Sequence, residues 1–237
     1  MSDFLLIHGS CHGRWCWRFL IAALEAQGHT ARAIDLPGHG DDPTPLTDVT
    51  LEMTADAILK ASDPGTILLG HSWGGIPISL AAEMNPSAMR GLIYLCAYVP
   101  VAGLSMIDLR KRARRQPLMG AIVKDELGQS YTIDPDQVPA LFYHDCPVDS
   151  VALALDRLTP QAIRPQDTAL VSTTRWQGVP KAYIRCTKDR TIPPEYQTEM
   201  TADWPLDRVF EMQTSHSPFF ADPQGLATLM GHISRGL

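Results

Sequence analysis

A serine flanked by glycines carries the clearest chemical signal in this chain of 237 residues. The stretch TILLGHSWGG, residues 66–75, places Ser72 between Gly70 and Gly74, after an apolar run and before a helical pattern. This is the Gly-x-Ser-x-Gly spacing of a nucleophile elbow, a sharp turn that exposes the serine hydroxyl above the end of a strand. Side chains two residues to either side would collide across such a turn, so glycine is needed there. The pattern predicts Ser72 as a nucleophile.

A serine hydroxyl is a weak nucleophile unless a base accepts its proton, and histidine is the commonest base. The chain has eight histidines. His216 follows the last expected strand, Arg208–Met212, so it lies in a loop at the carboxyl edge of the sheet, where it can reach Ser72. His232 falls within a terminal helical pattern and is interpreted as a surface or packing residue. We predict His216 as the general base.

A carboxylate should orient that histidine, and in this arrangement the acid lies between the serine and the histidine in the chain. Asp189 fits because it lies in the loop after the expected strand Lys181–Cys186. Asp203 is placed at a helix end and Asp207 at a strand start, which is the wrong edge of the sheet. We predict Asp189 as the acid that holds the tautomer of the histidine.

Acyl transfer also needs two backbone N–H groups aimed at the oxyanion that forms on the carbonyl. One donor is the residue after the nucleophile, Trp73, and the other comes from the loop after the first core strand. That loop is HGSCHG, residues 8–13, in which Gly9 permits close approach of the backbone and Ser10 follows it. We predict the N–H groups of Ser10 and Trp73 as the oxyanion donors.

The opening region also carries Cys11, His12 and Cys16, whose residue types could bind a metal ion. A structural zinc site needs four ligands, and no second pair is spaced to complete one. We therefore expect no metal, buried thiols at both cysteines, and hydrogen bonds from His8 and His12 that brace the loop.

These residues lie far apart in the chain, so a scaffold must bring them to one edge. Short apolar runs alternate with helical patterns, as in a parallel sheet that helices cover on both faces. The expected strands are Phe4–Ile7, Thr30–Ile34, Thr66–Leu69, Leu92–Cys96, Lys181–Cys186 and Arg208–Met212. The expected helices are Trp15–Gln27, Leu51–Ala61, Trp73–Met84, Pro194–Ala202 and Gln224–Ser234. The sequence predicts an α/β fold with a mostly parallel sheet of about six strands.

One interval breaks the alternation of strands and helices. Residues 100–178 contain helical and loop-like sequence without a convincing strand. We expect this interval to form a mainly helical cap over the carboxyl edge of the sheet, where α/β proteins place their sites. Residues 1–99 and 179–237 would then form the core.

The cap contains RKRARR, residues 110–115. This run could be a nucleic-acid or anion patch, or a solvated helix face beside Ile107 and Leu118. The net charge of −6 favours the solvated face, because a nucleic-acid binder normally has a basic excess. A role of the run in steering anionic substrates stays open.

The bulk composition fits one folded domain with an inserted subdomain. Apolar residues make up 45% and charged residues 19%, which disfavours disorder. The run Phe4–Ile7 is too short for a secretion signal, and the weakly polar stretch 91–104 is too short for a membrane span of ~20 residues. Five cysteines at irregular spacing then indicate free thiols in a reducing cytoplasm.

Several stretches resemble a known superfamily. His8-Gly9, DLPGHG at residues 35–40 and GHSWGG at residues 70–75 resemble the α/β-hydrolases. HGSCHGRWCW, from residue 8, looks like the opening signature of the plant methylesterase and hydroxynitrile lyase family, which has bacterial esterase relatives. Two further segments that resemble this family are FYHDCPVDSVALALDRLTPQAIRP and YIRCTKDRTIPPEYQ. The similarity spans nearly the whole chain.

The resemblance implies an α/β-hydrolase fold with a helical cap, a Ser72–Asp189–His216 triad and no cofactor. It also implies cleavage of small carboxylic esters through an acyl-enzyme intermediate. In the methylesterases, the oxyanion donors fall at the positions that match Ser10 and Trp73. The expected partner is a small-molecule ester, with no nucleic acid and no membrane, and a homodimer stays open.

Two other functions remain on the same scaffold. The lyase branch of the resembling family has a lysine after the catalytic histidine, a threonine at the position of Gly9 and an acidic residue at the position of His71. This chain has Ser217 after His216 and lacks all three marks, so hydrolysis is favoured over a cofactor-free lyase. The other alternative is a non-catalytic small-molecule receptor. An incomplete triad would favour it, and the triad expected here is complete.

Overall fold

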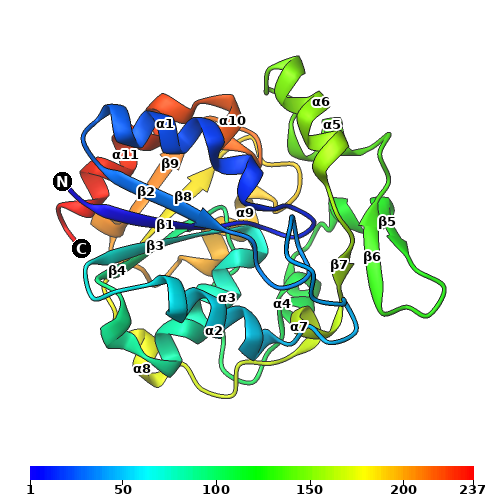
Figure 1. The fold of residues 1–237 in the computed structure, drawn as a ribbon, viewed down its shortest axis with the longest axis horizontal. Helices are drawn as coiled ribbons and strands as arrows, with labels where there is room; N and C mark the ends of the chain where they lie inside the picture. The colour runs from blue at the N-terminus through cyan, green and yellow to red at the C-terminus, as the bar shows by residue number, and fades with distance from the viewer.

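Six parallel strands form the central sheet of the structure, a computed structural model that describes residues 1–237. The strands are β1 (Asp3–Ile7), β2 (Thr30–Ile34), β3 (Thr66–His71), β4 (Gly91–Leu95), β8 (Lys181–Cys186) and β9 (Val209–Met212). Their order across the sheet is β2-β1-β3-β4-β8-β9 (Figure 1). All five pairings are parallel, so the prediction of a mostly parallel sheet of about six strands is confirmed. The carboxyl ends of the strands therefore meet at one edge.

Helices cover both faces of this sheet, and each face has its own apolar core (Figure 1). The core helices are α1 (Arg18–Ala26), α2 (Leu51–Ala61), α3 (Gly75–Met84), α9 (Pro194–Met200), α10 (Pro218–Ala221) and α11 (Pro223–Ser234). Phe4 and Leu6 of β1 pack with α1, α10 and α11. Leu5 and Ile7 pack with α2, α3 and α9 on the opposite face. Burial on both faces explains why the strands appear as continuous apolar runs in the sequence.

Two of the predicted helices begin with a tighter turn than expected. The 3-10 turn η1 (Arg14–Trp17) precedes α1, and the 3-10 turn η2 (Ser72–Gly74) precedes α3. Gly28, with a φ of +80°, follows the end of α1, in the left-handed conformation that favours glycine after a helix. The start of the last strand also differs, because η5 (Leu206–Arg208) occupies the position predicted for its first residue.

The interval between β4 and β8 forms a cap that contains both helices and strands (Figure 1). Its helices are α4 (Met106–Arg112), α5 (Val138–Phe142), α6 (Val148–Arg157), α7 (Arg164–Asp167) and α8 (Thr174–Gln177), with the 3-10 turn η4 (Pro117–Ala121). Its strands are β5 (Ile122–Lys124), β6 (Ser130–Ile133) and β7 (Gln161–Ala162), which form an antiparallel sheet. The cap is mainly helical as predicted, but the expectation that it contains no strand is wrong.

The turn between β5 and β6 explains why these strands were missed. The strands have only three and four residues, too few to give a clear apolar alternation. The Oδ1 atom of Asp125 accepts the N–H groups of Gln129 at 2.7 Å and Ser130 at 3.1 Å, and Gly128 has a φ of +66°. The hydrogen bonds of the turn therefore stabilise the hairpin more than the pairing of its two short strands does.

No helix of the protein combines the length and apolarity that crossing a membrane requires.

The five cysteines are free thiols, of which four are buried and Cys146 is half-buried. Burial raises the pKa of the Cys146 thiol to about 12, so this side chain is a protonated thiol near neutral pH.

A single carboxylate joins the end of the cap to the core. Glu83 of α3 accepts the backbone N–H groups of Arg175 at 2.8 Å and Trp176 at 2.9 Å, and the hydroxyl of Ser172 at 2.7 Å. The indole N–H of Trp176 also donates to the hydroxyl of Tyr94 in β4, at 2.7 Å. The short helix α8 is thereby attached to the helix that begins at the elbow.

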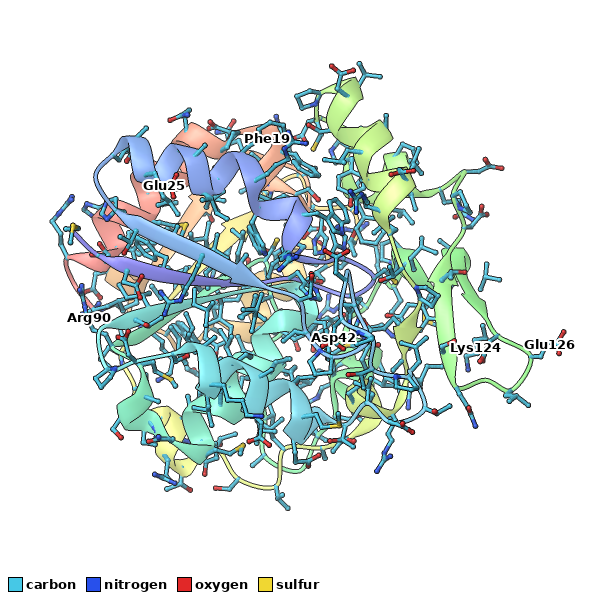
Figure 2. All side chains as sticks on the ribbon, in the orientation of Figure 1. Phe19, Glu25, Asp42, Arg90, Lys124 and Glu126 are labelled. Carbon is cyan, nitrogen blue, oxygen red and sulfur yellow. The ribbon has the colours of Figure 1, made fainter.

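We predict that Glu83→Ala lowers the free energy of unfolding by about 1–3 kcal/mol, because it leaves N–H donors of α8 without their acceptor. Urea denaturation followed by circular dichroism measures this. Glu126→Ala is the control, because Glu126 is an exposed residue of the β5–β6 hairpin (Figure 2), and it should change stability by less than about 0.5 kcal/mol. If Glu83→Ala and Glu126→Ala unfold with the same free energy, Glu83 does not stabilise the attachment of α8 to α3.

Candidate active site

Ser72 lies where β3 ends and η2 begins, in a backbone conformation that few residues adopt. Its φ is +55°, in the left-handed region, which costs on the order of 1 kcal/mol for a residue with a Cβ. A Cβ on Gly70 would lie 2.7 Å from the carbonyl oxygen of Gly74. A Cβ on Gly74 would lie 2.7 Å from the carbonyl oxygen of His8. Both glycines of the motif are therefore required by backbone contacts, and the strained turn holds Ser72 above the strand.

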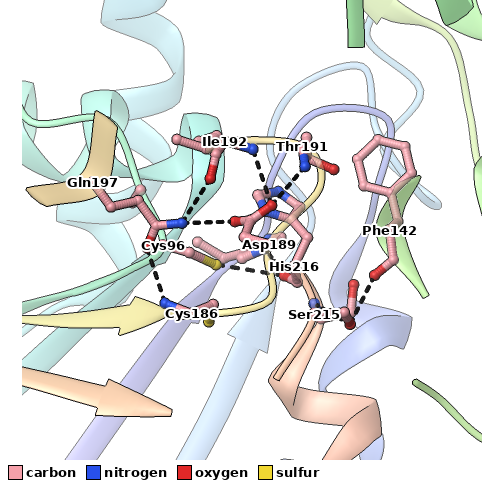
Figure 3. A network of polar contacts seen from close by, with 12 residues as sticks. Cys96, Phe142, Cys186, Asp189, Thr191, Ile192, Gln197, Ser215 and His216 are labelled. Atoms are coloured by element: carbon pink, nitrogen blue, oxygen red, sulfur yellow. Dashed lines mark hydrogen bonds and ion pairs between the residues drawn. The ribbon is translucent and has the colours of Figure 1, made fainter. Parts of the chain in front are cut away.

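His216 and Asp189, from two different loops, form a buried pair (Figure 3). Nδ1 of His216 lies 2.7 Å from Oδ2 of Asp189, and both side chains are fully buried. Oδ1 of Asp189 accepts the N–H groups of Thr191 at 2.7 Å and Ile192 at 3.0 Å. The carboxylate can only accept, so Nδ1 carries a proton, and in the neutral imidazole Nε2 is then the nitrogen with a free lone pair. Nε2 is buried and has no hydrogen-bond partner.

Gln197 of α9 also belongs to this network, although no sequence pattern marks it. Its Nε2 donates to Oδ2 of Asp189 at 2.9 Å and to the carbonyl of Ile192 at 2.8 Å (Figure 3). Its Oε1 accepts the N–H of Cys186 at the end of β8, at 2.9 Å. Glutamine in a short helix usually faces solvent, so only the packing of α9 on β8 reveals this residue.

Ser72, His216 and Ser10 line one cavity between the sheet edge and the cap. The other lining residues are His12, His71, Tyr98, Met106, Arg110, Leu118, Tyr131, Ile133, Phe142, Thr191 and Ile192. No hydrogen bond joins Ser72 to Nε2 of His216 in the structure, and such contacts often tighten only when substrate binds. The rival acids Asp203 and Asp207 are exposed and do not line this cavity.

The two predicted oxyanion donors come from two different segments: Ser10 lies in the loop after β1, and Trp73 lies in η2. The N–H of Ser10 has no acceptor among the backbone hydrogen bonds of the loops. Trp73 lies in the first turn of the η2–α3 unit, where N–H groups have no acceptor within the helix. The hydroxyl of Ser10 accepts Nε2 of Gln166 at 2.7 Å, and Oε1 of Gln166 accepts the hydroxyl of Tyr131 at 3.1 Å. The side chain of Ser10 thus binds the cap, and its backbone N–H is free.

Histidines of the opening loop hold its backbone in place. Nδ1 of His8 donates to the carbonyl of Gly9 at 2.8 Å, and its Nε2 accepts the N–H of Leu36 at 3.1 Å. Nδ1 of His12 donates to the carbonyl of Ser10 at 2.7 Å, and its Nε2 accepts the hydroxyl of Tyr143 at 2.5 Å. Burial lowers the pKa of His12 to about 4. The expected bracing role agrees with these contacts.

One group of residue types that bind metals converges near the site. His71, Cys96 and His216 offer ligand atoms that lie within 4.8 Å of one another. Nε2 of His71 donates to the carbonyl of His216 at 2.8 Å, and Nδ1 of His216 is bound to Asp189. Burial raises the pKa of the Cys96 thiol well above its ordinary value, which disfavours the thiolate that a metal needs. These contacts fit a packed hydrogen-bond network better than a metal centre.

The parallel sheet, the elbow after β3 and the paired loops after β8 and β9 define an α/β hydrolase. A model described as "Alpha/beta hydrolase family" matches residues 4–229, and the chain belongs to this family. Methylesterase 1 of Arabidopsis thaliana is 33% identical over 245 residues, covering 95% of this chain and 93% of the relative. The resemblance to the α/β-hydrolases and the plant methylesterases is thus confirmed.

Solved structures agree with this assignment. A novel pyrethroid hydrolase from Sphingobium faniae JZ-2 matches with a TM-score of 0.86 and 27% identity, covering 99% of this chain and 97% of that one. Polyneuridine aldehyde esterase matches with a TM-score of 0.87 and 25% identity, covering 99% of both chains. The relatives share the fold over essentially the whole length of this chain.

We predict that Gly74→Ala lowers the free energy of unfolding by about 1–3 kcal/mol, because the added methyl group meets the carbonyl oxygens of Ile7 and His8. Urea denaturation measures this loss. The matched control is Gly120→Ala in the cap, where the added Cβ has no neighbour within 4 Å. That control should change stability by less than about 0.5 kcal/mol. A neutral Gly74→Ala would show that the elbow tolerates a side chain there.

Proposed function

We propose that this protein is a serine carboxylesterase in which Ser72, His216 and Asp189 form the catalytic triad. The observation that carries the proposal is the buried pair of His216 and Asp189. It leaves Nε2 of His216 unprotonated and unpartnered at the cavity that Ser72 also lines. A free imidazole nitrogen beside a strained serine is the arrangement that activates a hydroxyl as a nucleophile.

In the first half of the reaction, Nε2 of His216 takes the hydroxyl proton as Oγ of Ser72 attacks the ester carbonyl. The carbonyl oxygen becomes an oxyanion, which the N–H groups of Ser10 and Trp73 bind. The tetrahedral intermediate collapses when His216 returns the proton to the leaving alcohol. The acyl group is then esterified to Ser72.

In the second half, a water molecule replaces the alcohol. His216 takes a proton from this water as it attacks the acyl carbonyl, and the same two N–H groups bind the new oxyanion. Collapse releases the carboxylic acid and restores the hydroxyl of Ser72. Asp189 remains a carboxylate throughout and holds the imidazole in the tautomer that both steps need. No cofactor takes part in this scheme.

The substrate in this proposal is a small carboxylic ester. The cavity is lined on several sides by apolar side chains, including Met106, Leu118, Ile133 and Phe142, which suit a partly apolar acyl or alcohol group. The relatives named above are a methylesterase, a pyrethroid hydrolase and an esterase, which supports ester hydrolysis as the reaction class.

The surroundings of Gly9 favour hydrolysis over the lyase reaction. A Cβ on Gly9 would lie 2.9 Å from Nδ1 of His71 and 2.9 Å from Cβ of Ser72. A threonine at this position, as in the lyase branch, would collide with the elbow while His71 is present. Glycine at position 9 and histidine at position 71 therefore fit each other sterically, which favours hydrolysis over the lyase arrangement.

We predict that Ser72→Ala lowers the turnover of p-nitrophenyl acetate by at least about 10³-fold, because it removes the nucleophile. A fluorophosphonate probe should label the wild-type protein at Ser72 and should not label this variant. Ser87→Ala, which changes an exposed serine, is the control and should retain both activity and labelling.

Two results would contradict the proposal. One is undiminished turnover by a purified and folded Ser72→Ala variant. The other is cyanide release from mandelonitrile by a wild-type protein that does not hydrolyse esters, which would indicate the lyase reaction. A triad protein that neither turns over esters nor reacts with the probe would instead be a small-molecule receptor.

A further inference from the structure

Arg110 differs from every other residue that lines the cavity. It lies in the last turn of α4, and its side chain reaches the space shared by Ser72 and His216. The Nε atom of Arg110 is buried and has no hydrogen-bond partner. The side chain as a whole is half-buried, but this one N–H donor is out of reach of solvent and costs free energy unless something binds it.

Arg110 has no acidic partner in the cavity lining, because the carboxylate of Asp189 is paired with His216 and is not one of the lining residues. The lining contains no aspartate and no glutamate, and Arg110 is the one arginine or lysine. Burial lowers the pKa of His71 well below its ordinary value and that of His12 to about 4, so both are neutral near pH 7. Arg110 is therefore the one arginine, lysine or carboxylate side chain in the lining of the cavity.

The other charged residues of the basic run, residues 110–115, either form ion pairs or are exposed to solvent. Lys111 pairs with Asp108 at 3.5 Å, and Arg115 pairs with Glu195 at 2.7 Å. Arg112 and Arg114 are exposed. The interpretation of the run as a solvated helix face fits these residues, whereas Arg110 is half-buried and also lines the cavity.

The periodicity of α4 explains this division. Ser105 and Asp108 form a capping box that fixes where the helix begins. Met106 and Leu109 are buried, so the residue four positions after Met106 lies on the same inward face. Arg110 is therefore presented to the cavity by a helix whose inner face is otherwise apolar.

Tyr98 connects this arginine to the elbow. Its backbone N–H donates to the carbonyl of Ser72 at 3.1 Å, and its ring lines the cavity. Burial raises the pKa of the Tyr98 phenol, and the charge of Arg110 is the largest influence that opposes this rise. Ser72, Tyr98 and Arg110 thus line the same cavity, which a ligand held at Ser72 would share with the guanidinium.

From this geometry we infer that the ester substrate carries a carboxylate group, which Arg110 binds while Ser72 attacks the ester carbonyl. The inference rests on the proposed esterase function. A guanidinium offers paired N–H donors that match the two oxygens of a carboxylate. The substrates of this class are monoesters of dicarboxylic acids and O-acylated hydroxy acids.

Two pairs of esters that differ only in the charged group test the inference. Monomethyl adipate is compared with methyl hexanoate, and 4-acetoxybutanoate with butyl acetate. For each pair, the measured quantity is kcat/KM for the anionic ester divided by kcat/KM for the neutral ester. We predict that Arg110→Gln lowers this ratio about 10- to 100-fold in at least one pair, because it removes a hydrogen bond between charged groups. Arg110→Lys should restore part of the ratio.

Arg112→Gln is the matched control, because it removes the same charge from the exposed side of the same helix. It should leave the ratio within about twofold, since an exposed charge is screened by solvent. An equal fall in Arg112→Gln would mean that the whole basic run steers anions, and would overturn a specific role of Arg110. An unchanged ratio in Arg110→Gln for both pairs would also overturn it.

A binding measurement separates this inference from the proposed function. Calorimetry compares the affinity of monomethyl adipate for Ser72→Ala and for Ser72→Ala combined with Arg110→Gln. We expect the second protein to bind at least tenfold more weakly. If the wild type hydrolyses none of the four esters, the proposed function fails, and this comparison still tests Arg110. If the esters are hydrolysed but neither measurement depends on Arg110, the inference fails and the esterase function stands.

Discussion

The contact between the elbow and the end of β1 is the constraint on which the site depends. The turn at residues 72–74 lies so close to the carbonyls of Ile7 and His8 that no Cβ fits at Gly74. At this close approach Ser72 is held in its strained conformation, with a φ of +55°. Parallel pairing of β1 with β3 makes the contact possible, because it aligns Ile7 with Gly70 at the same edge.

The proposed acid and base, Asp189 and His216, depend on a second pairing, between β8 and β9. Cys186 and Met212 lie opposite each other at the ends of these strands, so the following loops run side by side. The Asp189 carboxylate is then fixed by two backbone N–H groups and by Gln197 before it meets His216. The imidazole is positioned by hydrogen bonds at a fully buried place, so little reorganisation is needed when the reaction begins.

The sequence predicts those parts of the site that follow from strand ends and glycine spacing. Ser72 could be located because only a sharp turn explains both of its flanking glycines, and Asp189 because it follows a clear apolar strand. The β5–β6 hairpin could not, since its strands are short and its stability comes from the turn at Asp125. Arg110 was hidden among charged neighbours, and its role depends on the direction of one helix face, which composition alone does not fix.

The hydrogen bonds that join Ser10, Gln166 and Tyr131 have a consequence for laboratory evolution of this scaffold. Gln166 and Tyr131 belong to the cap, and Ser10 is the residue whose backbone N–H we propose as an oxyanion donor. Libraries that remodel the cap should therefore keep Gln166 and Tyr131 constant. Met106, Leu118 and Ile133 contact the same cavity through apolar side chains, so they are the positions at which selectivity can be varied with the least effect on rate.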